Sequence, residues 1–229
     1  MEVGAIILCR LDSTRLPGKV LRTTRGKPLL WYIISRCQEL KTPGNIIIVA
    51  TSTRKADDPI ADYCRQENVR VFRGSCDNVA DRIIKCCMEN NLEYFLRVNA
   101  DSPFLEPSLI HHACDVATSS KYEIVTNLYP RTFPYGVSVE LVRTDVFQSA
   151  YEQMSTPEHF EHATLFFYQN MERFRYYNIT RGGDNLSNMR LTVDTEQDWQ
   201  KFDLIVNKVG ERWKSISYLD AVELYRKEA

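Results

Sequence analysis

The densest group of side chains suited to chemistry lies in one short loop near the start of the chain. It combines cations, hydroxyls and a glycine, namely Arg10, Ser13, Thr14, Arg15, Gly18 and Lys19. A triphosphate needs several positive and hydrogen-bonding groups at close range, and this composition provides them. The spacing is not that of a Walker loop, G-x-x-x-x-G-K-[ST]. A solvated charged loop without a ligand is the alternative interpretation.

Two aspartates further along the chain are candidates for the same site. Asp101 follows the segment Tyr94–Val98, and Asp194 follows Arg190–Val193. If both segments are strands, each carboxylate stands at a C-terminal strand tip, where ligands of open α/β sheets bind. Both carboxylates can then face one cleft. The structural alternative is that Asp194 caps the helix after it and Asp101 caps a turn.

The elements that must hold these residues alternate between strand and helix. Val3–Cys9 is an unbroken apolar run, as expected of a parallel strand buried on both faces. After the loop, apolar residues recur with helical spacing at Leu30, Ile33, Ile34, Cys37 and Leu40. Further strands are expected at Asn45–Ala50, Val69–Phe72 and Tyr94–Val98, and helices at Asp57–Gln66 and Asn78–Glu89. This alternation predicts a three-layer α/β/α, Rossmann-like fold with a mostly parallel mixed sheet.

The second half of the chain continues without a linker, so we expect a single domain over residues 1–229. Ser155 and Glu158 form a capping signal around Pro157, which predicts one helix from there to about Asn170. Other helices are expected from Pro107, at Glu196–Val206 and at Leu219–Arg226. Strands are expected at Glu123–Thr126, Val137–Val142, Phe174–Ile179 and Arg190–Val193.

Composition and charge limit the class of partner. The chain has 229 residues, 44% of them hydrophobic and 26% charged, as is typical of a globular protein with one core. A net charge of −1 provides no basic field for nucleic acid or a membrane surface. No apolar run reaches the length of a membrane span, and the N-terminus lacks a signal-type core, so a cytoplasmic location is expected. The seven cysteines show no C-x-x-C spacing and are expected to be reduced structural thiols.

Several sequence motifs resemble a known enzyme family. C-R-L-D-S-T-R-L-P-G-K-V-L at residues 9–21 is followed by R-G-K-P-L-L at 25–30. Later motifs agree in order: R-G-S-C-D-N-V at 73–79, R-V-N-A-D-S-P at 97–103, R-T-F-P-Y-G at 131–136, E-H-A-T at 161–164 and R-L-T-V-D-T at 190–195. Together they resemble the cytidylyltransferases that activate acidic sugars, such as 3-deoxy-manno-octulosonate and acylneuraminate cytidylyltransferases. Their spore-coat polysaccharide SpsF-type branch is the nearest in pattern, and the resemblance spans nearly the whole chain.

The resemblance implies a GT-A-like nucleotidyltransferase fold and transfer of CMP from CTP to an acidic sugar, with release of pyrophosphate. Ulosonic and nonulosonic acids would be the acceptors, and the product would serve cell-surface polysaccharide or lipopolysaccharide biosynthesis. Mg²⁺, a hard ion that binds carboxylates and phosphates, would be held by Asp101 and Asp194, which would be catalytic together with Lys19. The nucleotide would be bound by Arg10, Ser13, Arg15, Lys19, Arg73, Asp77 and Asn99. Arg82 belongs to the segment that would flank the base.

The resemblance further divides the chain into a nucleotide-binding half, residues 1–105, and a sugar-binding half, residues 106–229, with a homodimer expected. The carboxylate of the sugar needs a cation, and the candidate set is Arg131 with His159 or His162. Tyr135 either frames the sugar ring or belongs to a dimer interface.

One departure from the family pattern concerns the acceptor. SpsF-like chains tend to read R-T-F-P-D-G-x-D-x-E, whereas Tyr135 and Ser138 stand in place of the first two of those acids here. The substitutions put the acceptor sugar in question and leave the nucleotide half untouched.

Three alternatives share the architecture. A glycosyltransferase usually carries a D-x-D metal motif, whereas this strand end reads Asn99-Ala100-Asp101. A guanylyl- or uridylyltransferase would differ in base contacts that sequence does not reveal. A non-catalytic nucleotide-binding homologue would have no need to keep Lys19, Asp101 and Asp194 together.

Overall fold

The computed structural model of the chain describes residues 2–40 and 46–227. Its centre is a seven-stranded sheet with the order β5-β4-β1-β6-β8-β7-β9. The strands are β1 Val3–Leu8, β4 Ile46–Ser52, β5 Arg70–Gly74, β6 Tyr94–Asn99, β7 Ile124–Thr126, β8 Glu140–Arg143 and β9 Tyr176–Asn178. A separate small hairpin pairs β2, Thr23–Thr24, with β3, Lys27–Pro28. The first four strands of that order, β5, β4, β1 and β6, are mutually parallel, as the alternating apolar runs predict.

The sheet changes direction once past β6. Strand β8 runs antiparallel to both β6 and β7, and β7 pairs in parallel with β9 at the edge. The expected mostly parallel mixed sheet is therefore confirmed, and the open end of the parallel half lies at the loops after β1, β4, β5 and β6.

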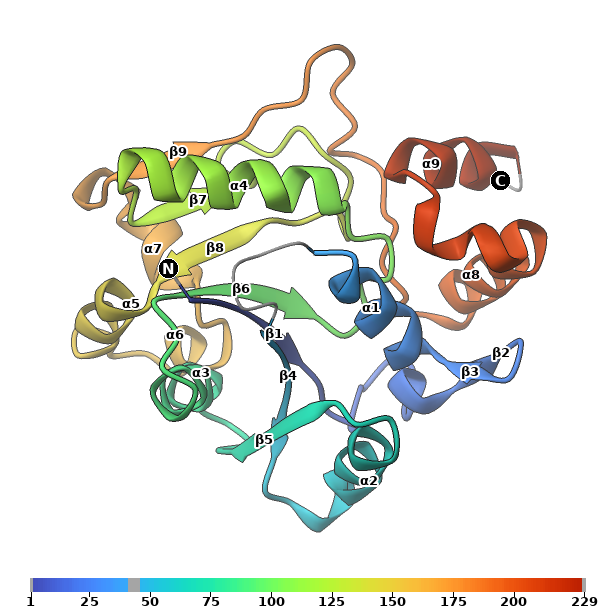
Figure 1. Ribbon diagram of the computed structural model, residues 1–229, viewed down its shortest axis with the longest axis horizontal. Coiled ribbons are helices and arrows are strands. Elements are labelled where there is room, and N and C mark those ends of the chain that lie inside the picture. The colour runs from blue at the N-terminus through green and yellow to red at the C-terminus, as the bar shows by residue number, and fades with distance from the viewer. Residues whose placement is uncertain (1, 41–45, 228–229) are drawn as a thin grey trace.

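Helices cover both faces of the sheet and complete three layers (Figure 1). One face packs against α1 Leu29–Gln38, α2 Asp58–Gln66 and α4 Pro107–Ser120, and α8 Glu196–Val209 and α9 Tyr218–Lys227 extend the same core beside α1. The other face packs against α3 Val79–Glu89, α5 Thr144–Tyr151 and α7 Leu165–Gln169, with the short α6 Pro157–Glu161 beside them. Helix α5 has no counterpart among the expected elements.

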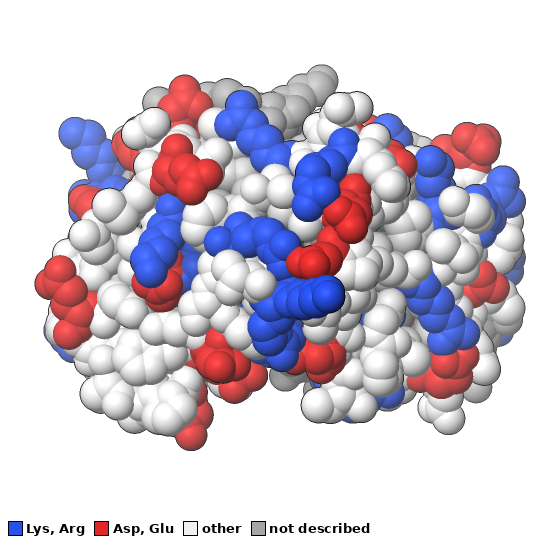
Figure 2. Space-filling model, turned by 90° about the horizontal axis from the view of Figure 1, so that it is seen from below, with Lys and Arg blue, Asp and Glu red and all other residues white. Residues whose placement is uncertain are grey.

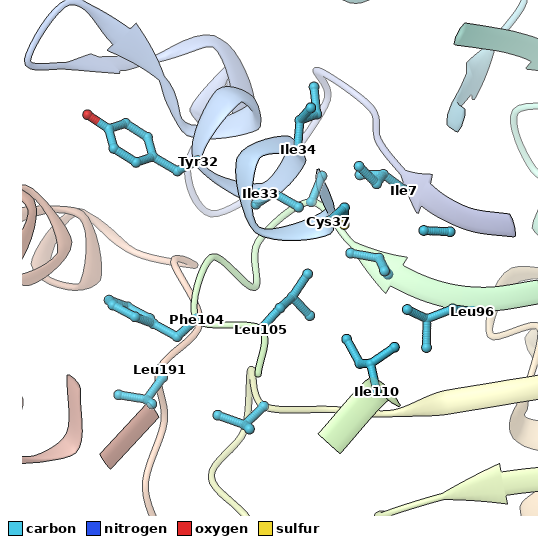
Figure 3. Close-up of a cluster of buried hydrophobic side chains, with 14 of the residues drawn as sticks. Ile7, Tyr32, Ile33, Ile34, Cys37, Leu96, Phe104, Leu105, Ile110 and Leu191 are labelled. Carbon is cyan, nitrogen blue, oxygen red and sulfur yellow. The ribbon is translucent and has the colours of Figure 1, made fainter. Parts of the chain in front are cut away.

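The larger core lies on the α1 face (Figure 3). Ile33 and Cys37 from α1 meet Ile7 of β1 and Leu96 of β6 in one continuous apolar cluster. All four side chains are at most 1% exposed. Because alternate residues of β1 and β6 are buried in this cluster, the intervening positions face the opposite side, where Arg97 and Asn99 border a cleft.

Two expected elements differ from the structure in ways that affect the site. Arg190–Val193 is not a strand, because its hydrogen bonds go to two loops and not to a neighbouring strand: Leu191 N donates to Tyr135 O, and Val193 N donates to Asp101 O. Only an isolated bridge joins Tyr135 to Arg190. Asp194 therefore follows an extended loop segment and does not stand at a strand tip.

The single helix expected up to Asn170 is divided into α6 and α7. Helix α6 begins at Pro157 as expected, but its cap is Thr156, whose hydroxyl accepts from His159 N, and not Ser155. His162 then leaves the helical conformation, with φ −97° and ψ 67°. Beyond the break, the Thr164 hydroxyl donates to the buried carboxylate of Glu140 at 2.6 Å, which fixes the start of α7 on the sheet.

Smaller differences concern element ends. Strand β8 begins at Glu140, three positions later than expected from Val137. Asn45, expected to begin a strand, lies outside the described residues. Within the described ranges, no helix is long and apolar enough to cross a membrane. On the face drawn in Figure 2, basic and acidic side chains are interspersed, in agreement with the near-zero net charge.

Candidate active site

A cleft of about 420 Å³ opens at the C-terminal edge of the parallel strands. It lies where the loops after β1 and β6 meet the segment that leads into α8. The residues around it are Leu8, Cys9, Arg10, Asp12, Ser13, Thr14, Arg15, Lys19, Val20, Val79, Arg82, Arg97, Asn99, Ala100, Asp101, Glu161, His162 and Asp194. Carboxyl ends of parallel strands are where ligands bind in α/β sheets, so the topology and the polar lining indicate the same place.

The loop after β1 is folded back on itself by a glycine and a buried aspartate. Gly18 adopts φ +69°, a left-handed conformation that glycine tolerates, and its N–H donates to Leu11 O at 2.9 Å. Leu11 N in turn donates to Asp57 Oδ1 at 2.8 Å, while the Ser52 hydroxyl donates to Asp57 Oδ2. Since Asp57 is fully buried, it anchors the loop to the end of β4 and holds the loop's cations over the cleft.

Lys19 connects the two candidate aspartates. Its Nζ donates to Val193 O at 2.7 Å and to Asp194 Oδ1 at 3.0 Å, and lies 3.5 Å from Asp101 Oδ2. The residue is only 8% exposed. One ammonium group thus joins three segments that are far apart in the sequence, and it does so at the wall of the cleft.

Asp194 is surrounded by positive charge. Arg15 lies 3.0 Å from its Oδ1, and Arg190 and the Thr192 hydroxyl each lie 3.1 Å from its Oδ2. Burial alone would raise the pKa of this carboxyl, but the hydrogen bond and charge of Lys19, together with Thr192 and Arg15, hold the pKa below its usual value. The carboxylate is therefore ionised throughout the neutral range.

The capping alternative for Asp194 does not apply. Helix α8 is capped by Thr195, whose hydroxyl accepts from Asp198 N while the Asp198 carboxylate accepts from Thr195 N, a complete capping box. Asp101 sits in a turn, with Ser102 Oγ donating to its Oδ1 at 2.9 Å and its Oδ2 directed to Lys19.

Asp101 and Asp194 fit a hard cation that also binds substrate phosphates. One oxygen of each carboxylate contacts the same Lys19 Nζ, and both residues border the cleft. In the described parts of the chain no group of three or more His, Cys, Asp or Glu forms a complete metal cage. Mg²⁺ does not need one, since it is usually held by one or two carboxylates together with phosphates and water.

The structure gathers some of the predicted site residues at the cleft and places others elsewhere. Arg10, Ser13, Arg15, Lys19, Asn99, Asp101, His162 and Asp194 all border it. Arg73 does not: its guanidinium is occupied by Ser52 O, Arg54 O and the Asp58 carboxylate beside β5. Asp77 borders a neighbouring cavity that shares Arg10 and Glu161 with the cleft.

His159 is also away from the cleft. It is 9% exposed, its Nε2 lies 2.7 Å from Gln169 Oε1, and its Nδ1 accepts from Ser155 N. With both ring nitrogens engaged, the side chain joins α6 to α7. Of the two histidines proposed for sugar binding, only His162 borders the cleft, because the break after α6 turns it away from the buried face.

Arg131 and Tyr135 are not among the residues that border the cleft, but Arg190 links them to Asp194. The Arg131 guanidinium stacks over the Tyr135 ring at 4.2 Å from the centroid, and the Arg190 guanidinium lies 4.9 Å from the same centroid. Arg190 also contacts Asp194, so a continuous row of side chains leads from Arg131 to the candidate metal site. Arg131 has no carboxylate partner among the described residues, and burial lowers its pKa.

Two further arginines of the cleft were not singled out as site residues. Arg97 lies inside the R-V-N-A-D-S-P motif and pairs with buried Glu140 at 2.5 Å. Arg82 was assigned only to the segment near the base, and the structure buries it at the cleft wall. A helical wheel of α3 would place Arg82 on the same face as the buried residues Val79 and Ile83, which is the sequence signal that marks it as unusual.

A family description, cytidylyltransferase, matches residues 4–216. The chain belongs to the cytidylyltransferase family. The expected enzyme class, a nucleotidyltransferase of the cytidylyltransferase family, and the expected α/β fold class are both confirmed.

Individual relatives match this chain over nearly its whole length. The spore coat polysaccharide biosynthesis protein SpsF of Bacillus subtilis is 29% identical over 92% of this chain and 89% of its own length. The structure of a cytidylyltransferase from Leptospira borgpetersenii superposes with a TM-score of 0.91 at 26% identity, covering 100% of this chain and 95% of that one. The structure of CMP:2-keto-3-deoxy-manno-octonic acid synthetase, solved with CTP, superposes with a TM-score of 0.66 at 17% identity. The match covers 91% of this chain and 99% of that one, and it shows a likeness of fold.

Proposed function

We propose that this cytidylyltransferase transfers CMP from CTP to the anomeric hydroxyl of an acidic sugar and releases pyrophosphate. The observation that carries the proposal is the convergence of Lys19, Asp101 and Asp194 with Arg15 at one wall of the cleft. Two carboxylates that face a cluster of cations suit a metal–triphosphate complex. The metal ion would bind the carboxylates, and the phosphates would bind the cations. The likeness of fold to CMP:2-keto-3-deoxy-manno-octonic acid synthetase, solved with CTP, supports the same nucleotide and an acidic acceptor.

The chain's own residues supply positioning and charge. Lys19 and Arg15 would hold the β- and γ-phosphates and stabilise the leaving pyrophosphate. Asp101 and Asp194 would hold Mg²⁺, which when bound neutralises charge at the α-phosphate and lowers the pKa of the attacking hydroxyl. Asn99 and Arg10 border the same cleft and would contact the ribose, phosphates or base. The rate of attack by the sugar hydroxyl on the α-phosphate then depends on how well these residues align the two substrates.

The acceptor would lie at the Arg131–Tyr135–Arg190 row. Arg131 offers a half-buried guanidinium with no carboxylate partner in the described chain, which suits the carboxylate of an acidic sugar. Ser138, 3.4 Å from Arg131 Nη1, takes the place of an acid in the SpsF-like pattern, so this guanidinium is left available. His162 would complete the acceptor side. We further propose a role in cell-surface polysaccharide biosynthesis, in line with the name of the SpsF relative, and a homodimer, which the family resemblance implies.

The test is pyrophosphate release from each of the four nucleoside triphosphates with Mg²⁺ and a panel of free octulosonic and nonulosonic acids. Release with CTP and one acid is the expected result, and Asp101→Asn and Asp194→Asn should each abolish it. Release with UTP or GTP instead would assign another nucleotide. CTP binding without release for any acid would favour a non-catalytic nucleotide-binding protein.

A further inference from the structure

Glu140 is a buried carboxylate whose two oxygens have different partners. It is the first residue of β8 and is 2% exposed. Its Oε1 accepts from the Thr164 hydroxyl at 2.6 Å and from the Tyr168 hydroxyl at 2.9 Å, both on the α7 side. Its Oε2 accepts from Arg97 Nη1 at 2.5 Å. Because two hydroxyls fix one oxygen, the other oxygen is held in a single direction, facing Arg97.

Arg97 uses only part of its guanidinium in this contact. Its Nη1 bonds to Glu140 and lies 3.4 Å from Thr164 Oγ1, and its Nε is buried without a partner. Nη2 also lacks a hydrogen-bond partner in the described chain, but it is not buried. The side chain is 17% exposed and borders the cleft. Since a guanidinium is planar and rigid, anchoring Nη1 sets the direction in which Nη2 presents its donors to the cleft.

The sheet order places this pair on the side of the cleft where we locate the acceptor. In the order β1-β6-β8-β7, the loop with Lys19 follows β1, whereas the loop between β7 and β8 carries Arg131. Arg97 on β6 bonds to Glu140 on β8, so its guanidinium is directed away from β1. Burial lowers the pKa of Arg131 and the charge of Glu140 opposes this effect, so Glu140 is also a neighbour of Arg131. Arg97 thus brings a second guanidinium from the Arg131 side to the cleft.

We infer that Glu140 is a positioning residue that holds Arg97 so that Nη2 donates a hydrogen bond to the acidic sugar. The inference rests on the proposed function and deepens it, because it adds a binding residue and its support to the acceptor site. A hydrogen bond from a guanidinium to a carboxylate oxygen is among the stronger ones in proteins. Without Glu140, the long side chain of Arg97 would have no fixed direction. An ion pair that only stabilised the fold would not distinguish the two substrates.

The experiment compares the KM values of both substrates in Glu140→Gln by initial-rate pyrophosphate release. The substrates are CTP and 3-deoxy-manno-octulosonate, or the nonulosonic acid that the wild type uses best. Glutamine keeps one oxygen for Thr164 and Tyr168, so its amide nitrogen would face Arg97 Nη1, donor against donor. KM for the acid should rise about tenfold, while KM for CTP should stay within about twofold of the wild type.

A double-mutant cycle tests whether Glu140 acts through Arg97. Arg97→Met removes the donor itself and should raise KM for the acid about tenfold to a hundredfold. Adding Glu140→Gln to Arg97→Met should cause no further rise, because the two residues belong to one network. The double variant replaces a buried ion pair with two neutral side chains of similar size, so it should fold even if a single variant does not. Its KM for the acid should still exceed that of the wild type at least about tenfold.

Tyr168→Phe is the matched control for stability. It removes one hydrogen bond to the same buried carboxylate and leaves Thr164 and Arg97 in place. The melting temperature should fall while KM for the acid stays unchanged, since Tyr168 does not border the cleft. Arg97→Lys keeps the charge, but a single ammonium lacks the planar fork that reaches Glu140 and a ligand together. This variant should therefore fold normally and still bind the acid more weakly.

Three results would overturn the inference. An unchanged KM for the acid in folded Glu140→Gln would make the ion pair purely structural. An equal rise in KM for CTP would assign Arg97 to the nucleotide. A further loss when Glu140→Gln is added to Arg97→Met would show that Glu140 does not act through Arg97. The absence of pyrophosphate release by the wild type with CTP and any acid would instead refute the proposed function, so the two failures are distinguishable.

Discussion

Lys19 connects parts of the site that are far apart in the sequence. Its Nζ reaches Asp101, 82 positions away, and Asp194, 175 positions away. An ammonium with three oxygen neighbours is well placed both to hold the carboxylates before the nucleotide arrives and to take up the phosphates afterwards. Lys19 would therefore contribute both to the structure of the site and to the reaction.

Replacing this cation tests the proposed role directly. Lys19→Met should lower kcat/KM for CTP by roughly a hundredfold to a thousandfold, because a preorganised cation at the leaving phosphates would be lost. The measurement is initial-rate pyrophosphate release, with circular dichroism to confirm folding. Lys55→Met is the matched control, since Lys55 is exposed and does not border the cleft. A folded Lys19→Met that stays within tenfold of the wild type would contradict the assignment.

Asp194 gives the metal-free protein a defined pH dependence. Its pKa is lowered in the folded state, so the ionised carboxylate stabilises the fold above the ordinary aspartate value of about 3.9. That stabilisation is lost as the pH falls through the depressed folded-state value. The melting temperature of the wild type, compared with that of Asp194→Asn, should show a constant advantage from pH 7 to about 5 and a shrinking one below about 4. A difference that does not change with pH would show that ionisation of Asp194 has no part in it.

At the scale of elements, one glycine allows the segment before α8 to lie close to the loop that carries Tyr135. Gly136 has φ +94°, and a Cβ atom there would stand 2.9 Å from the carbonyl carbon of Leu191. This close approach allows Leu191 N to donate to Tyr135 O and Tyr135 N to donate to Met189 O, and it sets Arg190 beside Tyr135. The acceptor row and Asp194 therefore depend on the same contact.

Gly136→Ala should destabilise the protein by about 1–3 kcal/mol, because it combines an unfavourable backbone conformation with a steric overlap. Urea unfolding measures the change. Gly182→Ala serves as the control, since a Cβ atom at Gly182 would contact nothing within 4 Å. We also expect Gly136→Ala to raise KM for the acceptor more than KM for CTP. Equal stability of the two variants would show that the contact with Leu191 yields easily.

Features that depend on local sequence patterns could be predicted, whereas features that depend on long-range contacts could not. The parallel strands were predictable because β1 is a continuous apolar run and β4 and β6 are rich in apolar residues. Asp194 was identified as a residue but assigned to the wrong element, since the hydrogen bonds of Leu191 and Val193 go to distant loops. The separation of His159 from His162 was not predictable either, because the break after α6 comes from tertiary contacts of Thr164 with Glu140.

Arg73 and Arg82 show the same limit within one short segment. Both arginines lie in the segment from β5 into α3, yet Arg73 is occupied by Ser52 O, Arg54 O and Asp58, whereas Arg82 is buried at the cleft wall. Sequence spacing cannot separate them, because the difference depends on the room that Gly74 provides and on which carbonyls lie within reach.

At the scale of the whole molecule, the cleft is lined by loops from distant parts of the chain. The loop after β1, the turn after β6 and the segment before α8 meet through the side chains of Lys19, Arg15 and the two aspartates, and Val193 N also donates to Asp101 O. A bound Mg²⁺–CTP complex would therefore tie the first half of the chain to the second, and its binding energy would add to the stability of the entire fold.

We accordingly expect CTP and Mg²⁺ together to raise the melting temperature far more than either alone. At a CTP concentration of about 100 times Kd the added stability is about 2.7 kcal/mol, which for a chain of this size corresponds to roughly 5–10 °C. Removal of the metal with EDTA should return the melting temperature close to the CTP-only value, and Asp101→Asn should lack the joint effect while keeping a small CTP effect. An undiminished joint effect in Asp101→Asn would show that the metal is held elsewhere. A response to CTP that is indifferent to EDTA would show that Lys19, Arg15 and the loop after β1 bind the triphosphate without it.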